Sequence, residues 1–188
     1  MSTVVLVEGV TDELALSLAA RRLGRDLAGE GVAILPTNGA HAMGRHLRRL
    51  ASEQPRTGVA GLYDEGELEV VRSALERAGY GSSLDRDGLE GIGFFACSAD
   101  LEDELIRAAG ESAIARLIDD AGDAQAWHKF RQQQPWLGRP VDQQFRRFIR
   151  SVSERNSRYI AAMVEAIEPA SLPRPVLGLL EYVMPAHS

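Results

Sequence analysis

The sequence predicts an α/β protein: a parallel sheet of about four strands with helices on both faces, followed by a helical C-terminal subdomain. Short apolar runs rich in β-branched residues alternate with stretches whose apolar residues recur at helical spacing. This alternation indicates parallel strands joined by right-handed helical crossovers. It stops near residue 110, and beyond that point glycines and prolines separate helical patterns. We therefore predict an α/β domain at residues 1–110 and a helical subdomain at residues 111–188.

Four strand–helix units make up the predicted α/β domain. Their strands are apolar along the whole run, which is typical of strands buried on both faces of a sheet. The single cysteine, Cys97, ends the fourth run, so we expect a buried core side chain and no internal disulfide. The strand and helix of each unit are expected at residues 4–7 and 11–23, 32–35 and 41–50, 59–63 and 68–78, and 92–97 and 101–109.

The helical subdomain contains one strongly patterned helix, which we expect after Pro140. Its apolar positions form one stripe, and Arg146, Arg147 and Arg150 fall on the opposite face, where we expect them to be exposed. Such a face can contact phosphates, although a solvated charged face without function is the commoner case. The apolar stripe consists of Val141, Phe145, Phe148, Ile149 and Val152.

The composition is that of a globular protein and limits the classes of function. The 188 residues are 45% hydrophobic and 26% charged, and no apolar run is long enough to span a bilayer. The N-terminus lacks the pattern of a secretory signal, so we expect a cytoplasmic protein. The net charge of -6 argues against indiscriminate coating of nucleic acid. Residues 125–160 nevertheless hold eight basic and two acidic side chains, a net charge of +6, which leaves -12 for the rest of the chain.

Acidic side chains follow three of the four predicted strands. Because ligands of an open parallel sheet bind beyond the carboxyl ends of its strands, we expect these acids to share one crevice. Crowded carboxylates are costly unless a cation neutralises them. An all-oxygen ligand set, without paired cysteines or histidines, favours Mg²⁺ or Mn²⁺ over zinc. The candidate metal ligands are Glu8, Asp12, Asp64, Glu65, Glu67, Asp100 and Glu102.

Some of these acids also have a purely structural interpretation. Asp12 and Asp100 stand at the starts of predicted helices, where an acid complements the helix dipole or caps the first turn. Glu8 and Asp64 directly follow buried strands and have no evident capping role. We therefore expect metal binding first at Glu8 and Asp64, and we keep both interpretations for Asp12.

The most informative pattern combines an apolar strand ending in Glu8-Gly9, Asp12 one helical turn later, and Asp64. It resembles the first TOPRIM motif and the first acid of that family's DxD motif. Residues 37–40 and 100–105 are similar to the glycine-containing turn and the acidic segment of OLD-type nucleases, so the resemblance spans about the first 105 residues. It implies one or two Mg²⁺ ions for phosphodiester cleavage or nucleotidyl transfer, with Glu8, Asp12 and Asp64 as catalytic residues.

Three departures from the family pattern bear on activity. Gly66 takes the second DxD position, so Glu65 or Glu67 must substitute if a second ligand is required. The late lysine of OLD nucleases is absent from residues 154–158, where Arg155 or Arg158 offers charge but not an equivalent general acid. The chain also lacks the phosphate loop of the ATPase domain that precedes the TOPRIM domain in full-length OLD proteins. ATP hydrolysis is therefore not encoded here, and a separate ATPase subunit is a candidate partner.

The leading hypothesis is a Mg²⁺- or Mn²⁺-dependent endonuclease or nickase that acts on DNA. Its DNA binding should be weak and sensitive to salt, because most of the protein is acidic. The alternative is a TOPRIM-like nucleic-acid-binding or regulatory module that has lost catalysis. A receiver domain with Asp64 as phosphoacceptor fits the early acids but lacks a lysine at the last strand. The candidate nucleic-acid contacts are Arg146, Arg147, Arg150, Arg155 and Arg158.

Overall fold

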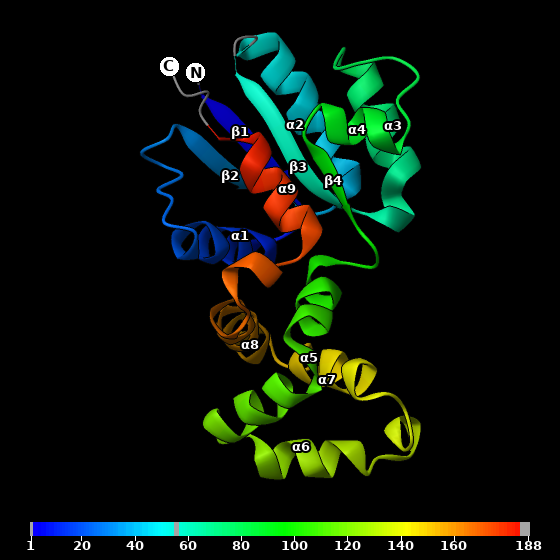
Figure 1. The fold of residues 1–188 in the computed structure, drawn as a ribbon. Helices are drawn as coiled ribbons and strands as arrows, with labels where there is room; N and C mark the ends of the chain where they lie inside the picture. The colour runs from blue at the N-terminus through cyan, green and yellow to red at the C-terminus, as the bar shows by residue number, and fades with distance from the viewer. Residues whose placement is uncertain (1, 55–56, 185–188) are drawn as a thin grey trace.

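A computed structural model describes residues 2–54 and 57–184 of the chain and contains a four-stranded sheet. All neighbouring strands are parallel, and their order across the sheet is β2-β1-β3-β4 (Figure 1). The predicted α/β class and parallel sheet are confirmed. The strands are β1 (Thr3–Val7), β2 (Val32–Pro36), β3 (Gly58–Asp64) and β4 (Phe94–Cys97).

The register of the sheet brings the carboxyl ends of its strands to one edge. Leu6 of β1 pairs with Gly61 of β3, and Asp64 at the end of β3 pairs with Cys97 at the end of β4. Glycine is needed at position 61, since a Cβ there would lie 2.7 Å from the Leu6 carbonyl oxygen and 2.9 Å from the Phe94 ring. The close packing of these strands therefore fixes where the acids that follow them emerge.

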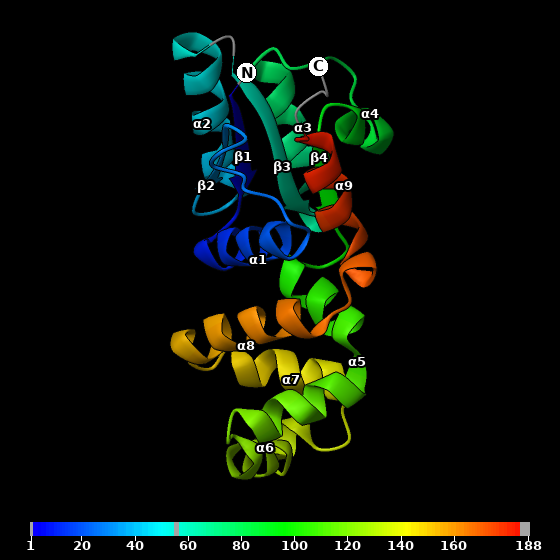
Figure 2. The same ribbon diagram turned by 60° about the vertical axis from the view of Figure 1, so that its left-hand side comes forward.

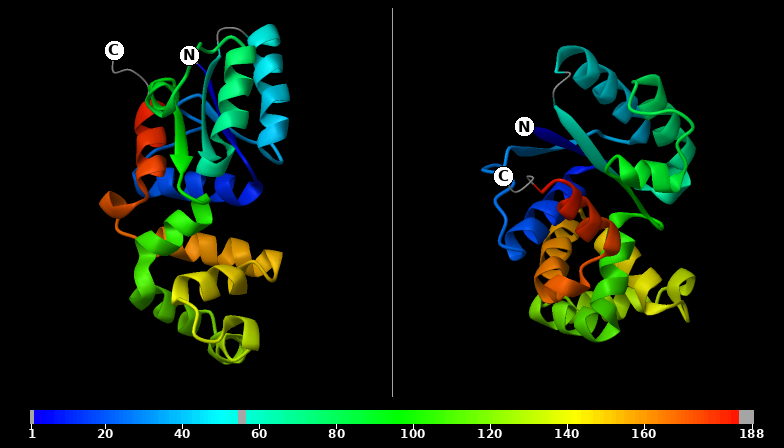
Figure 3. Two further views of the ribbon diagram at one scale, coloured as in Figure 1. Left: turned by 90° about the vertical axis from the view of Figure 1, so that its right-hand side faces the viewer. Right: turned by 45° about the horizontal axis from the view of Figure 1, so that its top comes forward.

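Helices cover both faces of the sheet, as predicted. One face packs against α1 and α9, and the other against α2 and α3 (Figure 3, left). Within the predicted sheet domain, the sequence did not predict helix α4 (Arg86–Gly91) or the 3-10 turn η1 (Glu65–Glu67). The four covering helices are α1 (Val10–Arg22), α2 (Ala40–Glu53), α3 (Leu68–Arg77) and α9 (Arg174–Tyr182).

Successive strand residues point into two separate cores. Val5 and Val7 join the core with Leu16 of α1, whereas Leu6 between them joins the core with Leu47 of α2. Alternation of this kind follows from the two-residue period of a strand. Cys97 is buried in the first core, as expected, and burial raises the pKa of its thiol.

The remaining helices form a second layer beneath the sheet, with α8 lying against α1 (Figure 2). Helix α5 bends at Gly110, whose φ of 74° is left-handed. Helix α7 ends at Ile149, so the predicted stripe was wrong at Val152, which is 49% exposed. Across residues 2–54 and 57–184, no helix is long and apolar enough to cross a membrane. The elements are α5 (Leu101–Asp120), α6 (Ala124–Arg131), η2 (Gln134–Trp136), α7 (Val141–Ile149), α8 (Ser153–Ala166) and η3 (Pro169–Ser171).

Helix α9 returns to the sheet although it lies far along the chain, within the predicted helical subdomain. It packs so closely that a Cβ at Gly178 would lie 2.7 Å from the Phe95 ring of β4. A Cβ at Gly93, whose φ is 89°, would lie even closer to a ring of α9, 2.4 Å from that of Tyr182. One face of the sheet is therefore closed partly by the C-terminal helix, and the division of the chain at residue 110 stays a prediction.

Candidate functional site

Five of the predicted acids line one cavity at the carboxyl edge of the sheet. Glu8 follows β1, Asp64 ends β3, and Asp100 caps helix α5 just after β4. Because these strands are parallel and adjacent, their ends place the carboxylates together. The cavity has a volume of about 170 Å³ and is lined by Glu8, Gly9, Thr11, Asp12, Asp64, Asp100, Glu102 and Arg150.

The two acids that flank Gly66 take different directions. Glu67 lines a small cavity together with Glu8, Asp12 and Asp64. Glu65 instead pairs with Arg86 of α4 at 2.8 Å and lies outside both cavities. Of the two predicted substitutes for the missing acid at position 66, Glu67 is therefore the one beside the acid cluster.

The structure gives Asp12 both of the roles that its position allows, as a cap of α1 and as a member of the acid cluster. Its Oδ2 accepts a hydrogen bond of 2.8 Å from the Gly9 amide, which caps the first turn of α1. Its side chain also lines the acid cavity. The pKa of Asp12 is raised to about 6, because burial and the charges of Glu8 and Asp100 outweigh the lowering effect of the hydrogen bond from Gly9. A role in capping α1 therefore does not remove Asp12 from the crowded acidic edge.

Asp64 shows the effect of crowding most clearly. Burial, together with the negative charges of Glu8, Asp100 and Glu67, raises its pKa to about 7. A carboxylate with so high a pKa is unfavourable in its charged form unless a cation or a proton neutralises it. The electrostatics of the edge therefore favour a positively charged ligand next to Asp64.

Helices α7 and α8 hold the two acids at the start of α5. Asp100 accepts hydrogen bonds from Arg146 and, at 3.4 Å, from Arg150. Glu102 accepts a 2.8 Å bond from Asn156 and lies 3.5 Å from Arg150. Burial raises the pKa of Glu102, whereas Asn156 and Arg150 lower it. The second layer of helices therefore forms one wall of the site.

These contacts differ from the expected exposed arginine face. Arg146 is only 31% exposed and turns toward Asp100, because α7 packs directly beside α5. Arg147 is exposed and, within the part of the chain that the structure describes, has no acidic partner. Asn156 is a site residue that the sequence analysis missed, since no motif marks a lone asparagine in a helix.

Arg155 and Arg158, the other predicted nucleic-acid contacts, are engaged elsewhere. Both pair with Asp123, at 3.5 Å and 2.5 Å, and the Tyr159 hydroxyl donates to the same carboxylate at 3.1 Å. Neither arginine lines the acid cavity. In this structure their pairing joins α8 to the turn before α6.

The acidic edge fits a divalent ion in its donor chemistry. Carboxylate oxygens are the ligands that Mg²⁺ and Mn²⁺ prefer. Burial and the neighbouring negative charges raise the pKa values of Asp12 and Asp64, and an ion would offset both effects. Among the described residues, however, no three Asp, Glu, His or Cys side chains are already arranged around a common point for an ion. The carboxylates would therefore have to turn toward one another to share it.

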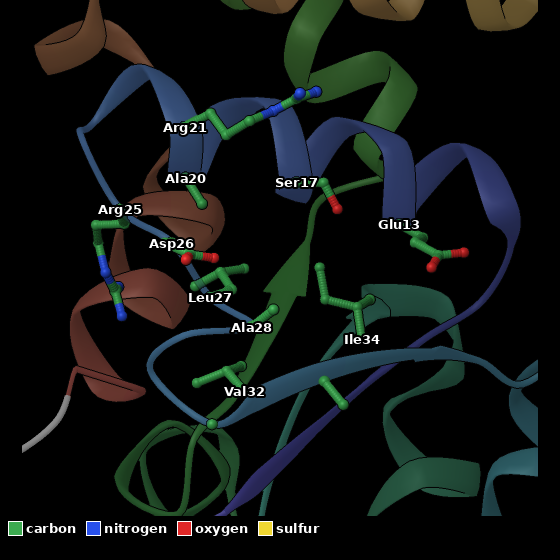
Figure 4. Close-up of a pocket in the computed structure, with 12 residues that line it drawn as sticks. Glu13, Ser17, Ala20, Arg21, Arg25, Asp26, Leu27, Ala28, Val32 and Ile34 are labelled. Atoms are coloured by element: carbon green, nitrogen blue, oxygen red, sulfur yellow. The ribbon is translucent and has the colours of Figure 1, made fainter.

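A larger cavity lies away from the acid cavity, between α1, β2 and the loop that joins them (Figure 4). It measures about 840 Å³, and its wall mixes apolar residues such as Leu27 and Ile34 with Glu13, Arg21 and Arg25. Glu8, Asp12 and Asp64 do not line it. Its size is therefore no evidence about chemistry at the acid cavity.

The fold and the strand-edge acids are those of an α/β domain with an acidic site at the carboxyl edge of a parallel sheet. The family model for the Overcoming lysogenization defect protein-like TOPRIM domain matches residues 1–57. The chain thus resembles an OLD-type TOPRIM domain over residues 1–57, as the sequence predicted.

Solved structures extend the likeness of fold beyond the matched segment. The C-terminal region of the Burkholderia pseudomallei OLD protein has a TM-score of 0.69 at 16% identity, with 96% of each chain covered. The C-terminal region of the Xanthomonas campestris pv. campestris OLD protein has a TM-score of 0.65 at 21% identity, covering 96% of this chain and 93% of that one. A comparison with curated proteins gives no match. The helical layer is therefore part of the shared fold.

Proposed function

We propose that this protein is a Mg²⁺- or Mn²⁺-dependent endonuclease or nickase that hydrolyses phosphodiester bonds in DNA. The proposal rests on one observation: five acids from three strand ends line the same cavity together with an arginine. The resemblance to OLD TOPRIM domains supports the same reaction class. A cytoplasmic location and a separate ATPase partner belong to the proposal and rest on sequence features and on that resemblance.

In this proposal Glu8, Asp12 and Asp64 hold the ion, and Glu67, Asp100 and Glu102 lie around them. When bound, a divalent ion supplies Lewis-acid stabilisation for negative charge that develops on phosphate oxygens. The chain itself places Asp64 at the end of β3 and Glu8 directly after β1, so the sheet sets where these two acids emerge.

Arg150 is the cation best placed to contact the substrate. Its guanidinium lies on the wall of the acid cavity and is 51% exposed, so a phosphate at the cavity mouth can reach it. Arg146 and Asn156 are positioning residues, because they hold Asp100 and Glu102 without lining the cavity. An arginine forms paired hydrogen bonds to a phosphate but does not act as an acid at neutral pH.

Nicking of supercoiled plasmid in Mn²⁺ or Mg²⁺ tests the proposal. The parent protein should nick, and Glu8→Gln and Asp64→Asn should each lower the rate by at least about a hundredfold, as expected when a preorganised charge is removed from an active site. Chelation of the ion should abolish nicking. Glu65→Gln is the matched control, because Glu65 pairs with Arg86 outside the cavity, and it should nick like the parent.

A non-catalytic nucleic-acid-binding or regulatory module is the second candidate. Two observations favour it: Asp100 and Glu102 are already partly neutralised by arginines, and the described residues hold no ready-made group of three metal ligands. If the parent binds DNA but never nicks it with either ion, the non-catalytic module becomes the better proposal and the nuclease proposal is wrong.

A further inference from the structure

One face of helix α2 carries a row of arginines that the sequence analysis did not single out. Arg45, Arg48 and Arg49 are all exposed, and their spacing of three and four residues places them on one face. The opposite face is buried through Met43 and Leu47. The row therefore points to solvent from the outer side of the molecule, where α2 lies beside α3 (Figure 3, left).

The row has no acidic partners within residues 2–54 and 57–184, in a chain where acids outnumber basic residues, 27 to 21. Helix α3 packs closely against α2, with Ala74 3.3 Å from a Cβ built at Gly44. The acids of α3 do not pair with the row, because Glu69 and Glu76 both pair with Arg72 of their own helix. Among the described residues, the three arginines thus form no ion pair, although Glu53 ends the same helix.

Helix α2 begins close to the acids, beside the small cavity that Glu8, Asp12, Asp64 and Glu67 line. The turn before it is tied to Glu8, whose carbonyl accepts a 2.9 Å hydrogen bond from the Asn38 amide. Met43 in its second turn lines the small cavity together with Asp12 and Asp64. Arg45 stands about 8 Å along the helix axis from the first residue of α2, and Arg49 about 6 Å further. The row therefore leads away from the acidic edge.

We propose that the Arg45–Arg48–Arg49 face of α2 binds the phosphate backbone of DNA that flanks the acid cavity, on the sheet side of the site. This rests on the proposed function for the identity of the ligand. Phosphates on one strand of a duplex follow one another every 3.4 Å of helix rise, so a row about 6 Å long spans about two of them. An acidic protein needs such a local cationic surface to hold a polyanion over a cluster of carboxylates.

Binding of a fluorescent DNA duplex in Ca²⁺ or in EDTA, at two salt concentrations, tests the row without requiring catalysis. Arg45→Glu with Arg49→Glu should weaken binding about tenfold or more. Arg45→Ala with Arg49→Ala should weaken it less and should make the dependence of log affinity on log salt shallower by about 1 to 2, since up to two phosphate contacts are lost. Thermal melting checks that each variant folds, and the row lies opposite the packed face, so folding should persist.

The matched control, Arg21→Glu with Arg116→Glu, reverses the charge of two exposed arginines on other elements. It changes the net charge by the same amount as Arg45→Glu with Arg49→Glu. If the control and the α2 variant lose the same affinity, overall charge explains the effect and the proposal is wrong. It is also wrong if a polyglutamate peptide binds the parent as tightly as DNA does. Plasmid nicking separates the two proposals. If the α2 variants lose DNA binding and the parent never nicks, the proposal for the arginine row is supported and the nuclease proposal is wrong. If the parent nicks DNA and the α2 variants bind it as tightly as the parent, only the proposal for the arginine row is wrong. If the parent neither binds nor nicks DNA, both proposals are wrong.

Discussion

At the scale of single residues, Asp64 should make the metal-free protein less stable as pH rises. Its ordinary pKa is 3.8, and the folded value is raised to about 7 by burial and by Glu8. Between those values the folded state holds a proton that the unfolded state has lost, so stability falls as pH rises from about 4 to 7 and then levels off. Asp64→Asn removes this effect. The variant should therefore gain stability over the parent at pH 8 and little at pH 4.

Urea unfolding in EDTA at both pH values measures that difference. Glu65→Gln serves as the control, because its side chain is exposed and pairs with Arg86. An Asp64→Asn variant with the same gain at pH 4 as at pH 8 would show that the effect does not come from ionisation.

Individual site residues were predictable where a strand pattern fixed them. Glu8 and Asp64 follow buried apolar runs, so the sequence placed them at the edge where the structure has them. The direction of Glu65 away from the edge depends on Arg86, 21 residues later, and on helix α4, which the sequence did not predict. Partners of this kind are set by tertiary packing, which local pattern does not encode.

At the scale of elements, the junction of α4, β4 and α9 should depend on Gly93. Its φ of 89° disfavours any side chain, and a Cβ would lie 2.4 Å from the Tyr182 ring. Gly93→Ala should therefore cost about 2 to 4 kcal/mol of unfolding free energy, from backbone strain plus overpacking. Gly79→Ala is the matched control, since its φ is 86° but nothing lies within 4 Å, and it should cost only about 1 to 2 kcal/mol. Equal losses in urea unfolding would mean that the Tyr182 ring moves aside freely.

Most elements of the sheet domain could be predicted, because fully apolar strands alternate with amphipathic helices. The return of α9 to the sheet could not, since its apolar residues would suit a helix bundle equally well. The arginines of α7 show the same limit. Their helical face was predicted, but the packing of α7 against α5, which turns Arg146 to Asp100, was not.

At the scale of the whole molecule, ion binding should stabilise the entire fold, because the acids join β1, β3 and α5 at one edge. An ion at about a hundred times its dissociation constant adds about 2.7 kcal/mol. For a chain of this size that raises the melting temperature on the order of 5 to 10 °C.

Glu8→Ala should melt higher than the parent without the ion, since Glu8 raises the pKa of both Asp12 and Asp64 by like-charge repulsion. The same variant should lose the Mg²⁺-induced shift, because a ligand is gone. Thermal melts with and without Mg²⁺ measure both effects, with Glu65→Ala as the control that keeps the shift. A full Mg²⁺ shift in Glu8→Ala would show that the ion binds elsewhere, and the nuclease proposal would then lose its metal site.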